Sequence, residues 1–160
     1  MRIKKTKEKK LRNKVNAKNQ MNDFLNKIST KLTMDIKENG LRRKIDGNLY
    51  KKDKERLDKI IESIPKPENM QAWIQVFLGS VKLHTKISFE SGPVSVNYLE
   101  DTQYICNLDE NDELERFFDW PQRPYYTLDG QLEKMEKLEK IEKKIEELEK
   151  EGFELERELI

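Results

Sequence analysis

The spacing of apolar residues changes twice along this chain, and these changes limit which elements it can form. In residues 11–36 apolar residues recur every three or four positions, which predicts a long helix, and in residues 81–89 they alternate with polar ones, which predicts a strand. A seven-residue repeat near the end predicts a second long helix. The sequence therefore predicts an α+β fold with a long N-terminal helix, a second helix, a small three-stranded antiparallel sheet in the middle and a long C-terminal helix of coiled-coil type.

The first third of the chain is predicted to be mostly helical. The apolar stripe of the first helix consists of Leu11, Val15, Phe24, Leu25, Ile28, Leu32 and Ile36. Residues 2–10 carry six basic residues against one acid, so we expect mutual repulsion to leave them unstructured without a partner. Asp46-Gly47 predicts a hairpin with a type I′ turn, and a second helix is expected to start after Asp53 as its N-cap and to end before Pro65.

The middle of the chain contains the sheet. Residues 67–79 fit a helix, with a buried strand over residues 72–78 as the competing interpretation. Strands are predicted over residues 81–89, 94–99 and 103–108. An acidic helix over residues 109–119 and an aromatic connector over residues 120–126 are expected to follow.

Three regions result from these predictions: a basic helical region with a hairpin (1–64), a small α+β core (65–126) and an amphipathic helix (127–160). Charged residues make up 39% of the chain and hydrophobic residues 35%. Much of the chain must therefore be exposed helix surface, and we expect an elongated molecule.

The two parts of the chain have opposite net charge. Residues 1–60 hold 20 of the 32 Lys and Arg residues and 8 acids, whereas residues 61–160 hold 12 basic residues and 23 acids. Such an asymmetry indicates binding to other macromolecules, or pairing of the two parts with each other.

The C-terminal helix has a coiled-coil pattern. Its a and d positions are Leu138, Ile141, Ile145, Leu148, Leu155 and Leu159. In a parallel homodimer Lys137 and Lys144 face Glu142 and Glu149 of the second copy, whereas an antiparallel pair would oppose like charges. The alternative is that this stripe packs within its own chain, against the stripe of the first helix.

Several classes of chemistry lack the residues that they need. His84 is the only histidine, Cys106 is the only cysteine and is expected to be a buried apolar residue, and the six glycines form no phosphate-binding loop. We expect no enzyme, metal site, cofactor or small-molecule substrate. No apolar run is long enough to cross a membrane, and the single cysteine favours a cytoplasmic location in a bacterial host cell.

Binding of nucleic acid, or of a nucleic-acid-binding machine, is the first functional hypothesis. Dense positive charge suffices for contact with phosphates, and asparagines such as Asn13, Asn19 and Asn22 add hydrogen-bonding groups. The candidate contact residues are Lys4, Lys5, Lys9, Lys10, Arg12, Lys14, Lys18, Arg42, Arg43 and Lys44.

Two other roles remain open. One is an inhibitor of a host defence nuclease, comparable to anti-CRISPR proteins, that presents an acidic and aromatic surface; its candidate contacts are Glu110, Asp112, Glu113, Trp120, Tyr125 and Tyr126. The other is a structural assembly protein. A composition rich in Lys, Glu, Asn and Ile and poor in Ala resembles that of small accessory proteins of phages and mobile elements.

Overall fold

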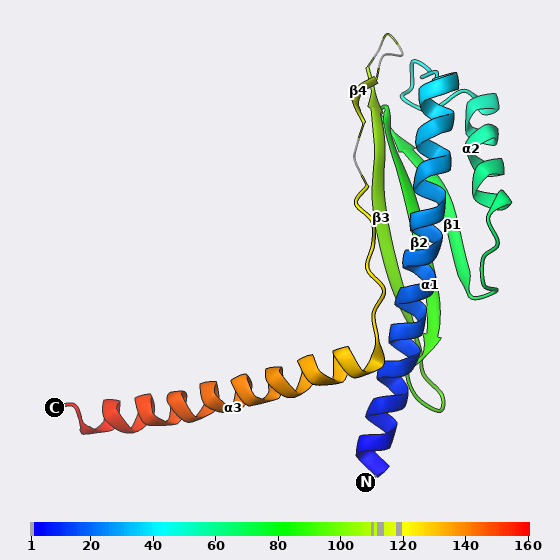
Figure 1. Cartoon of the computed structure of the whole chain (residues 1–160). Coiled ribbons are helices and arrows are strands. Elements are labelled where there is room, and N and C mark those ends of the chain that lie inside the picture. The colour runs from blue at the N-terminus through cyan, green and yellow to red at the C-terminus, as the bar shows by residue number, and fades with distance from the viewer. Residues whose placement is uncertain (1, 110, 112–113, 118–119) are drawn as a thin grey trace.

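A computed structural model describes residues 2–109, 111, 114–117 and 120–160, excluding the side chains of residues 2–6 and 114–117. The elements follow in the order α1 (Arg2–Asn39), α2 (Lys51–Ser63), β1 (Met70–Phe77), β2 (Ser80–Glu90), β3 (Val96–Leu108), β4 (Leu114–Phe117) and α3 (Leu128–Glu158) (Figure 1). The four strands form one antiparallel sheet in the order β1-β2-β3-β4. The predicted α+β class is confirmed, with one strand more than expected.

Two of the strands, β1 and β4, were not expected, and at β1 the helix predicted over residues 67–79 is wrong and the competing strand is right. Met70 and Ile74 point into the core, whereas Trp73 and Phe77 point outward and are 44% and 67% exposed. A two-residue turn joins β1 to β2, and both of its residues, Leu78 and Gly79, have positive φ as a type I′ turn requires. A Cβ atom at Gly79 would lie 2.4 Å from the Leu108 carbonyl oxygen, so only glycine fits there.

Two other predictions for the sheet are corrected. Residues 94–99 and 103–108 were expected to form two strands, but residues 96–108 form one continuous strand, β3. Its middle stays paired with β2, and the inward-facing Asp101 is accommodated there by its ion pair with Arg123. The acidic helix predicted over residues 109–119 is wrong as well. Leu114–Phe117 is strand β4, which pairs with Cys106–Leu108 at the edge of the sheet.

The predicted hairpin after α1 exists, with a different turn. Lys44 N–H donates to the Asn48 carbonyl and Gly47 N–H donates to the Lys44 carbonyl, while Arg43 bridges to Leu49. Of the loop residues only Gly47 has positive φ, so the connection is a three-residue loop rather than a two-residue type I′ turn. The expected N-cap is also wrong: Tyr50 occupies that position, and Asp53 lies inside α2.

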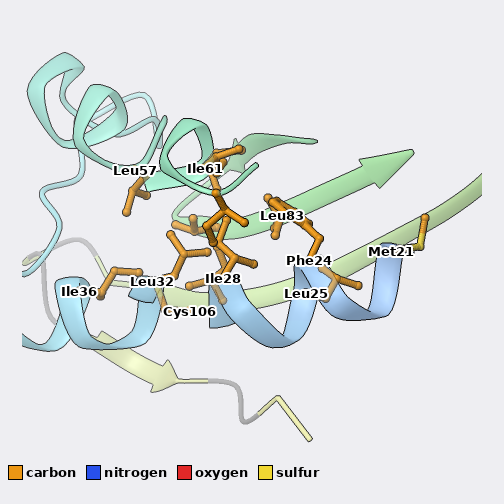
Figure 2. Packing of buried hydrophobic residues seen from close by; sticks show 14 of the residues in the cluster. Met21, Phe24, Leu25, Ile28, Leu32, Ile36, Leu57, Ile61, Leu83 and Cys106 are labelled. Atoms are coloured by element: carbon orange, nitrogen blue, oxygen red, sulfur yellow. The ribbon is translucent and has the colours of Figure 1, made fainter. Parts of the chain in front are cut away.

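The core lies between one face of the sheet and the helices α1 and α2 (Figure 2). The stripe of α1 contributes residues such as Met21, Leu25 and Ile28, and α2 contributes Leu57 and Ile61. From β2 and β3 the buried residues include Val81, Leu83, Ile87, Ile105 and Cys106, all at most 2% exposed. The alternation predicted for residues 81–89 is therefore confirmed, and the two helices leave the opposite face of the sheet uncovered.

Both terminal helices extend beyond this core (Figure 1). The helix α1 begins at Arg2, so the segment that was expected to be unstructured is helical; it continues a helix that is anchored from Val15 onward, and each added residue gains a hydrogen bond. The helix α3 leads away from the sheet. Within the described ranges, no helix is both long enough and apolar enough to cross a membrane.

Candidate nucleic-acid interface

The N-terminal part of α1 presents a basic surface, and we call residues 7–18 the basic segment. The N-terminal end of α1 extends past the sheet (Figure 1). Within the basic segment Lys9, Lys10, Arg12 and Lys14 are exposed while Lys18 is half-buried. None of the ion pairs between described side chains involves these five residues. Lys4 and Lys5 belong to the helix, but their side chains lie outside the described part of the chain.

The second basic cluster lies at the other end of α1. Arg42, Arg43 and Lys44 follow Asn39, which is 27 residues after Arg12 in the same helix, or about 40 Å at 1.5 Å per residue. The structure therefore does not bring the two clusters together into one surface.

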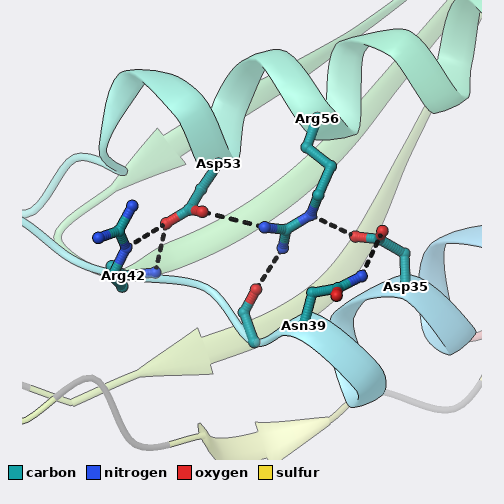
Figure 3. A network of polar contacts seen from close by, with 6 residues as sticks. Asp35, Asn39, Arg42, Asp53 and Arg56 are labelled. Carbon is teal, nitrogen blue, oxygen red and sulfur yellow. Dashed lines mark hydrogen bonds and ion pairs between the residues drawn. The ribbon is translucent and has the colours of Figure 1, made fainter.

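Arg42 and Arg43 also have structural partners, and Figure 3 shows those of Arg42 at Asp53. The backbone N–H and Nε of Arg42 donate to the Asp53 carboxylate at 2.9 and 3.2 Å, and its guanidinium lies 5.0 Å from the centre of the Tyr50 ring. The Nη1 of Arg43 donates to the Leu108 carbonyl at 3.2 Å. Arg42 and Lys44 are both exposed, but Arg42 is paired with Asp53, whereas no ion pair between described side chains involves Lys44.

Asp53 is the centre of a polar network that joins the end of α1 to α2 (Figure 3). Arg56 donates to Asp53 at 3.0 Å and to Asp35 at 2.8 Å, and also to the Gly40 carbonyl. The Asp53 side chain is only 7% exposed, so its negative charge depends on the two arginines. This network, rather than capping, explains the position of Asp53.

The asparagines of α1 bind the protein itself. Asn19, Asn22 and Asn26 lie along one side of the helix and hold the connector of residues 120–127. Asn19 exchanges two hydrogen bonds with the backbone of Tyr126, both 2.8 Å long, and Asn22 donates to the Pro124 carbonyl. Asn13 donates to the Glu90 carbonyl. These four amides therefore have structural partners, and three of them, Asn13, Asn19 and Asn22, had been candidates for hydrogen bonds to nucleic acid.

The connector aromatics that were candidates for partner binding differ in their surroundings. Trp120 is half-buried against the core and donates from its indole N–H to the Tyr104 carbonyl at 2.7 Å. Tyr125 is 81% exposed and Tyr126 is half-buried. Glu110, Asp112 and Glu113, the acidic candidates, lie outside the described residues.

The apolar seam of α3 is uncovered. None of its described residues is buried, and the a and d side chains Leu138, Ile141, Ile145, Leu148, Leu155 and Leu159 are 49–78% exposed. Thr127 caps the helix by accepting a hydrogen bond from the Gly130 N–H. The alternative that this stripe packs against the apolar stripe of α1 is wrong, because that stripe faces the sheet.

Cys106 is buried under α1, as expected from the sequence. Burial raises the pKa of its thiol from 9.0 to about 12. A thiol with this pKa is protonated at neutral pH and does not act as a nucleophile.

Sequence reasoning missed the aromatic residues on the uncovered face of the sheet. Trp73, Tyr98 and Tyr104 project from this face and are 44%, 57% and 46% exposed. Trp73 was assigned to a helix, and the two tyrosines were treated only as strand residues. A partial signal was present, since Gln71 and Gln75 alternate with apolar neighbours, but the apolar Trp73 and Phe77 share their face.

No protein-family model matches this chain, and neither a curated protein nor a solved structure is significantly similar to it.

Proposed function

We propose that this protein is a non-enzymatic interaction protein that binds nucleic acid through the basic segment of α1 and forms a parallel dimer through α3. The observation that carries the proposal is the exposure of Lys9, Lys10, Arg12 and Lys14 on a helix that extends past the sheet, with no acidic side chain paired to them in the described part of the chain. Exposed cations of this density bind phosphates by releasing counterions.

The acidic helix α3 does not cover the basic segment, and pairing of these two parts would be the main competing explanation of the charge asymmetry. The helix α3 carries 12 acids and 7 basic residues, yet it leads away from α1 (Figure 1). Its ion pair between Lys137 and Glu133 lies within the helix itself. The basic segment thus keeps its positive potential.

A dimer would strengthen the proposed binding. The start of α3 lies beside the basic segment (Figure 1), because Asn19 of α1 holds the backbone of Tyr126 just before α3 begins. In a parallel coiled coil two basic segments would therefore lie at the same end of the assembly. Two linked sites bind one polyanion with higher avidity than either site alone.

The salt dependence of binding by the full chain tests the basic segment. A variant with Lys9, Lys10 and Lys14 changed to Gln is compared with a control in which Lys140, Lys143 and Lys150 of α3, all outside the seam, are changed to Gln. We expect the first variant to bind a labelled duplex more weakly, with a salt slope less steep by up to about 0.9 for each phosphate that it no longer neutralises. Equal affinities of both variants and the wild type would contradict the proposal, as would the absence of any binding at about 50 mM salt.

The inhibitor hypothesis has less support among the described residues. Trp120, its central aromatic candidate, packs against the core and binds the Tyr104 carbonyl, so it is an anchor of the connector. Tyr125 alone among the described aromatic candidates of the connector is strongly exposed. A single exposed tyrosine is a weak basis for a protein interface.

A further inference from the structure

We infer that the uncovered face of the sheet binds single-stranded nucleic acid by stacking bases on its aromatic side chains. This inference deepens the proposed function: it rests on nucleic acid as the partner, and it names the strand state that the protein selects. The face belongs to β1, β2 and β3, opposite α1 and α2, so it is distinct from the basic segment.

The side chains of this face form rows across the three strands, as the register shows. One row contains Gln75, Lys82 and Tyr104, and the next contains Trp73, His84 and Thr102. Four residues after His84 in β2, and therefore two rows further on, Ser88 lies opposite Tyr98. A two-residue step along a strand is about 7 Å and neighbouring strands lie about 4.8 Å apart, so Trp73 of β1 and Tyr104 of β3, one row and two strands apart, are about 12 Å from each other at the backbone, a distance that an extended polynucleotide can span.

The rings are held in place before any ligand binds. Trp73 stacks on His84, with ring centres 5.5 Å apart and an angle of 13° between the planes, and the Thr102 hydroxyl lies 3.2 Å from His84 Nδ1. A ring that is already ordered loses little conformational entropy when a base stacks on it. Base stacking on aromatic side chains is the main source of affinity for single strands in sequence-tolerant binding sites.

Positive charge accompanies the two tyrosines. Lys82 Nζ lies 4.7 Å from the centre of the Tyr104 ring, and Lys86 Nζ lies 4.3 Å from the centre of the Tyr98 ring. Lys86 is also 3.7 Å from Glu100, an exposed ion pair that contributes little and is easily exchanged for a phosphate. Each lysine thus lies over one face of a tyrosine that is still 46% or 57% exposed, and it places a cation for a phosphate next to the ring on which a base would stack.

A hollow beside Tyr98 adds hydrogen-bonding groups. It has a volume of about 320 Å³, at the small end of ligand sites, and is lined by Glu68, Asn69, Gln71, Lys86, Ser88 and Tyr98. Amide, hydroxyl and carboxylate groups of this kind bind the edges of unpaired bases.

The arrangement favours a single strand over a duplex or a protein. Bases in a duplex are stacked on each other and cannot reach the rings. A protein partner would need a contiguous apolar centre to bury, whereas here polar side chains such as Gln75, Lys82 and Thr102 separate the aromatic rings.

The test measures binding of labelled oligothymidine and oligouridine of about 16 nucleotides, and of a duplex of the same length, to the full chain. The sheet variants are Trp73→Ala and Tyr98→Ala, both at exposed positions that leave the core intact, and Phe153→Ala in α3 is the matched aromatic control. We expect each sheet variant to bind the single strands about 5-fold to 100-fold more weakly, with duplex binding unchanged. The Phe153→Ala control is expected to bind as the wild type does.

Three other outcomes overturn the inference and distinguish it from the proposed function. If the sheet variants bind single strands as the wild type does while the Lys9/Lys10/Lys14 variant loses binding, the basic segment is the site and the sheet is not. If the wild type prefers the duplex, the face does not select single strands. If neither nucleic acid binds, both proposals fail and the face serves another occupant, such as a protein.

A spectroscopic measurement checks the stacking itself. The chain has two tryptophans, so a Trp120→Phe background leaves Trp73 as the only indole. We expect saturating oligothymidine to quench this fluorescence, because a base stacked on the ring is a contact quencher. Binding without any change in the Trp73 emission would contradict stacking at this residue.

Discussion

Asn26 holds the backbone of Arg123 by two hydrogen bonds, with its Nδ2 donating to the Arg123 carbonyl at 3.1 Å and its Oδ1 accepting from the Arg123 N–H at 2.8 Å. The side chain of Arg123 reaches the other way and forms a bidentate ion pair with Asp101 of β3, at 2.8 and 3.1 Å. One connector residue thereby links α1 to the sheet. Together with Asn19 and Tyr126, it determines where α3 leaves the core.

Removal of this clamp is expected to destabilise the fold. Asn26→Ala leaves the partly buried N–H and carbonyl of Arg123 without their partner, which should lower the free energy of unfolding by about 1–3 kcal/mol. Asn16→Ala, at an exposed position of the same helix, is the control and should change it by less than about 0.5 kcal/mol. Urea unfolding measures both, and equal stabilities of the two variants would show that the clamp contributes nothing.

The charge of Asp53 should matter more than that of any exposed acid. Asp53→Ala removes the carboxylate shared by Arg42 and Arg56, and the loss of these hydrogen bonds to a charged group should cost about 1.5–3 kcal/mol. Asp23→Ala removes an exposed pair with Lys27 and should cost less than about 1 kcal/mol. Thermal unfolding of both variants checks the difference, which should vanish only if the Asp53 network is not formed.

Cys106 should resist thiol reagents until the protein unfolds. Its pKa is raised from 9.0 to about 12 by burial, so at pH 8 the folded protein should react with a disulfide reagent far more slowly than the unfolded chain. Because the unfolded thiol ionises first, the wild type should also lose stability relative to Cys106→Ala as the pH rises from 9.0 towards 12. Rapid labelling under native conditions would mean that this part of the core opens.

The exposed seam of α3 should hold two chains together. Ile141→Glu with Ile145→Glu places charge at adjacent d and a positions and should convert a dimer into a monomer in sedimentation equilibrium. Lys140→Glu with Lys143→Glu, at c and f positions, is the matched control, and this variant should still sediment with the mass of a dimer. A wild-type chain that sediments as a monomer at all accessible concentrations would exclude the proposed pairing.

The elements predicted correctly are those with a local signal. The seven-residue repeat of residues 138–159 and the alternation of residues 81–89 depend on neighbours within a few positions, and the long helix and the strand that they predict are both present. In Met70–Phe77 the local signal is ambiguous, because Met70, Trp73, Ile74 and Phe77 fit a helix as well as a strand. Pairing with β2 decides in favour of the strand and places Trp73 and Phe77 on the outer face.

The candidate interface was predictable only in part, for a similar reason. The exposure of the Lys and Arg side chains in the basic segment could be predicted from composition, since that part of α1 has few apolar residues to bury. The structural roles of Asn19, Asn26 and Arg42 depend on partners elsewhere in the sequence. Asn26, for example, binds Arg123, which is 97 residues away. No local pattern distinguishes such residues from surface contacts.

Photocrosslinking of the full chain to oligothymidine, followed by mass spectrometry of the peptides, tests nucleic-acid contact most directly. We predict adducts on peptides from residues 7–18 and on those that contain Trp73, Tyr98 or Tyr104. If the adducts were confined to α3, or if no adducts formed at a protein concentration that saturates binding of the oligonucleotide, neither the basic segment nor the uncovered face of the sheet would be a contact surface.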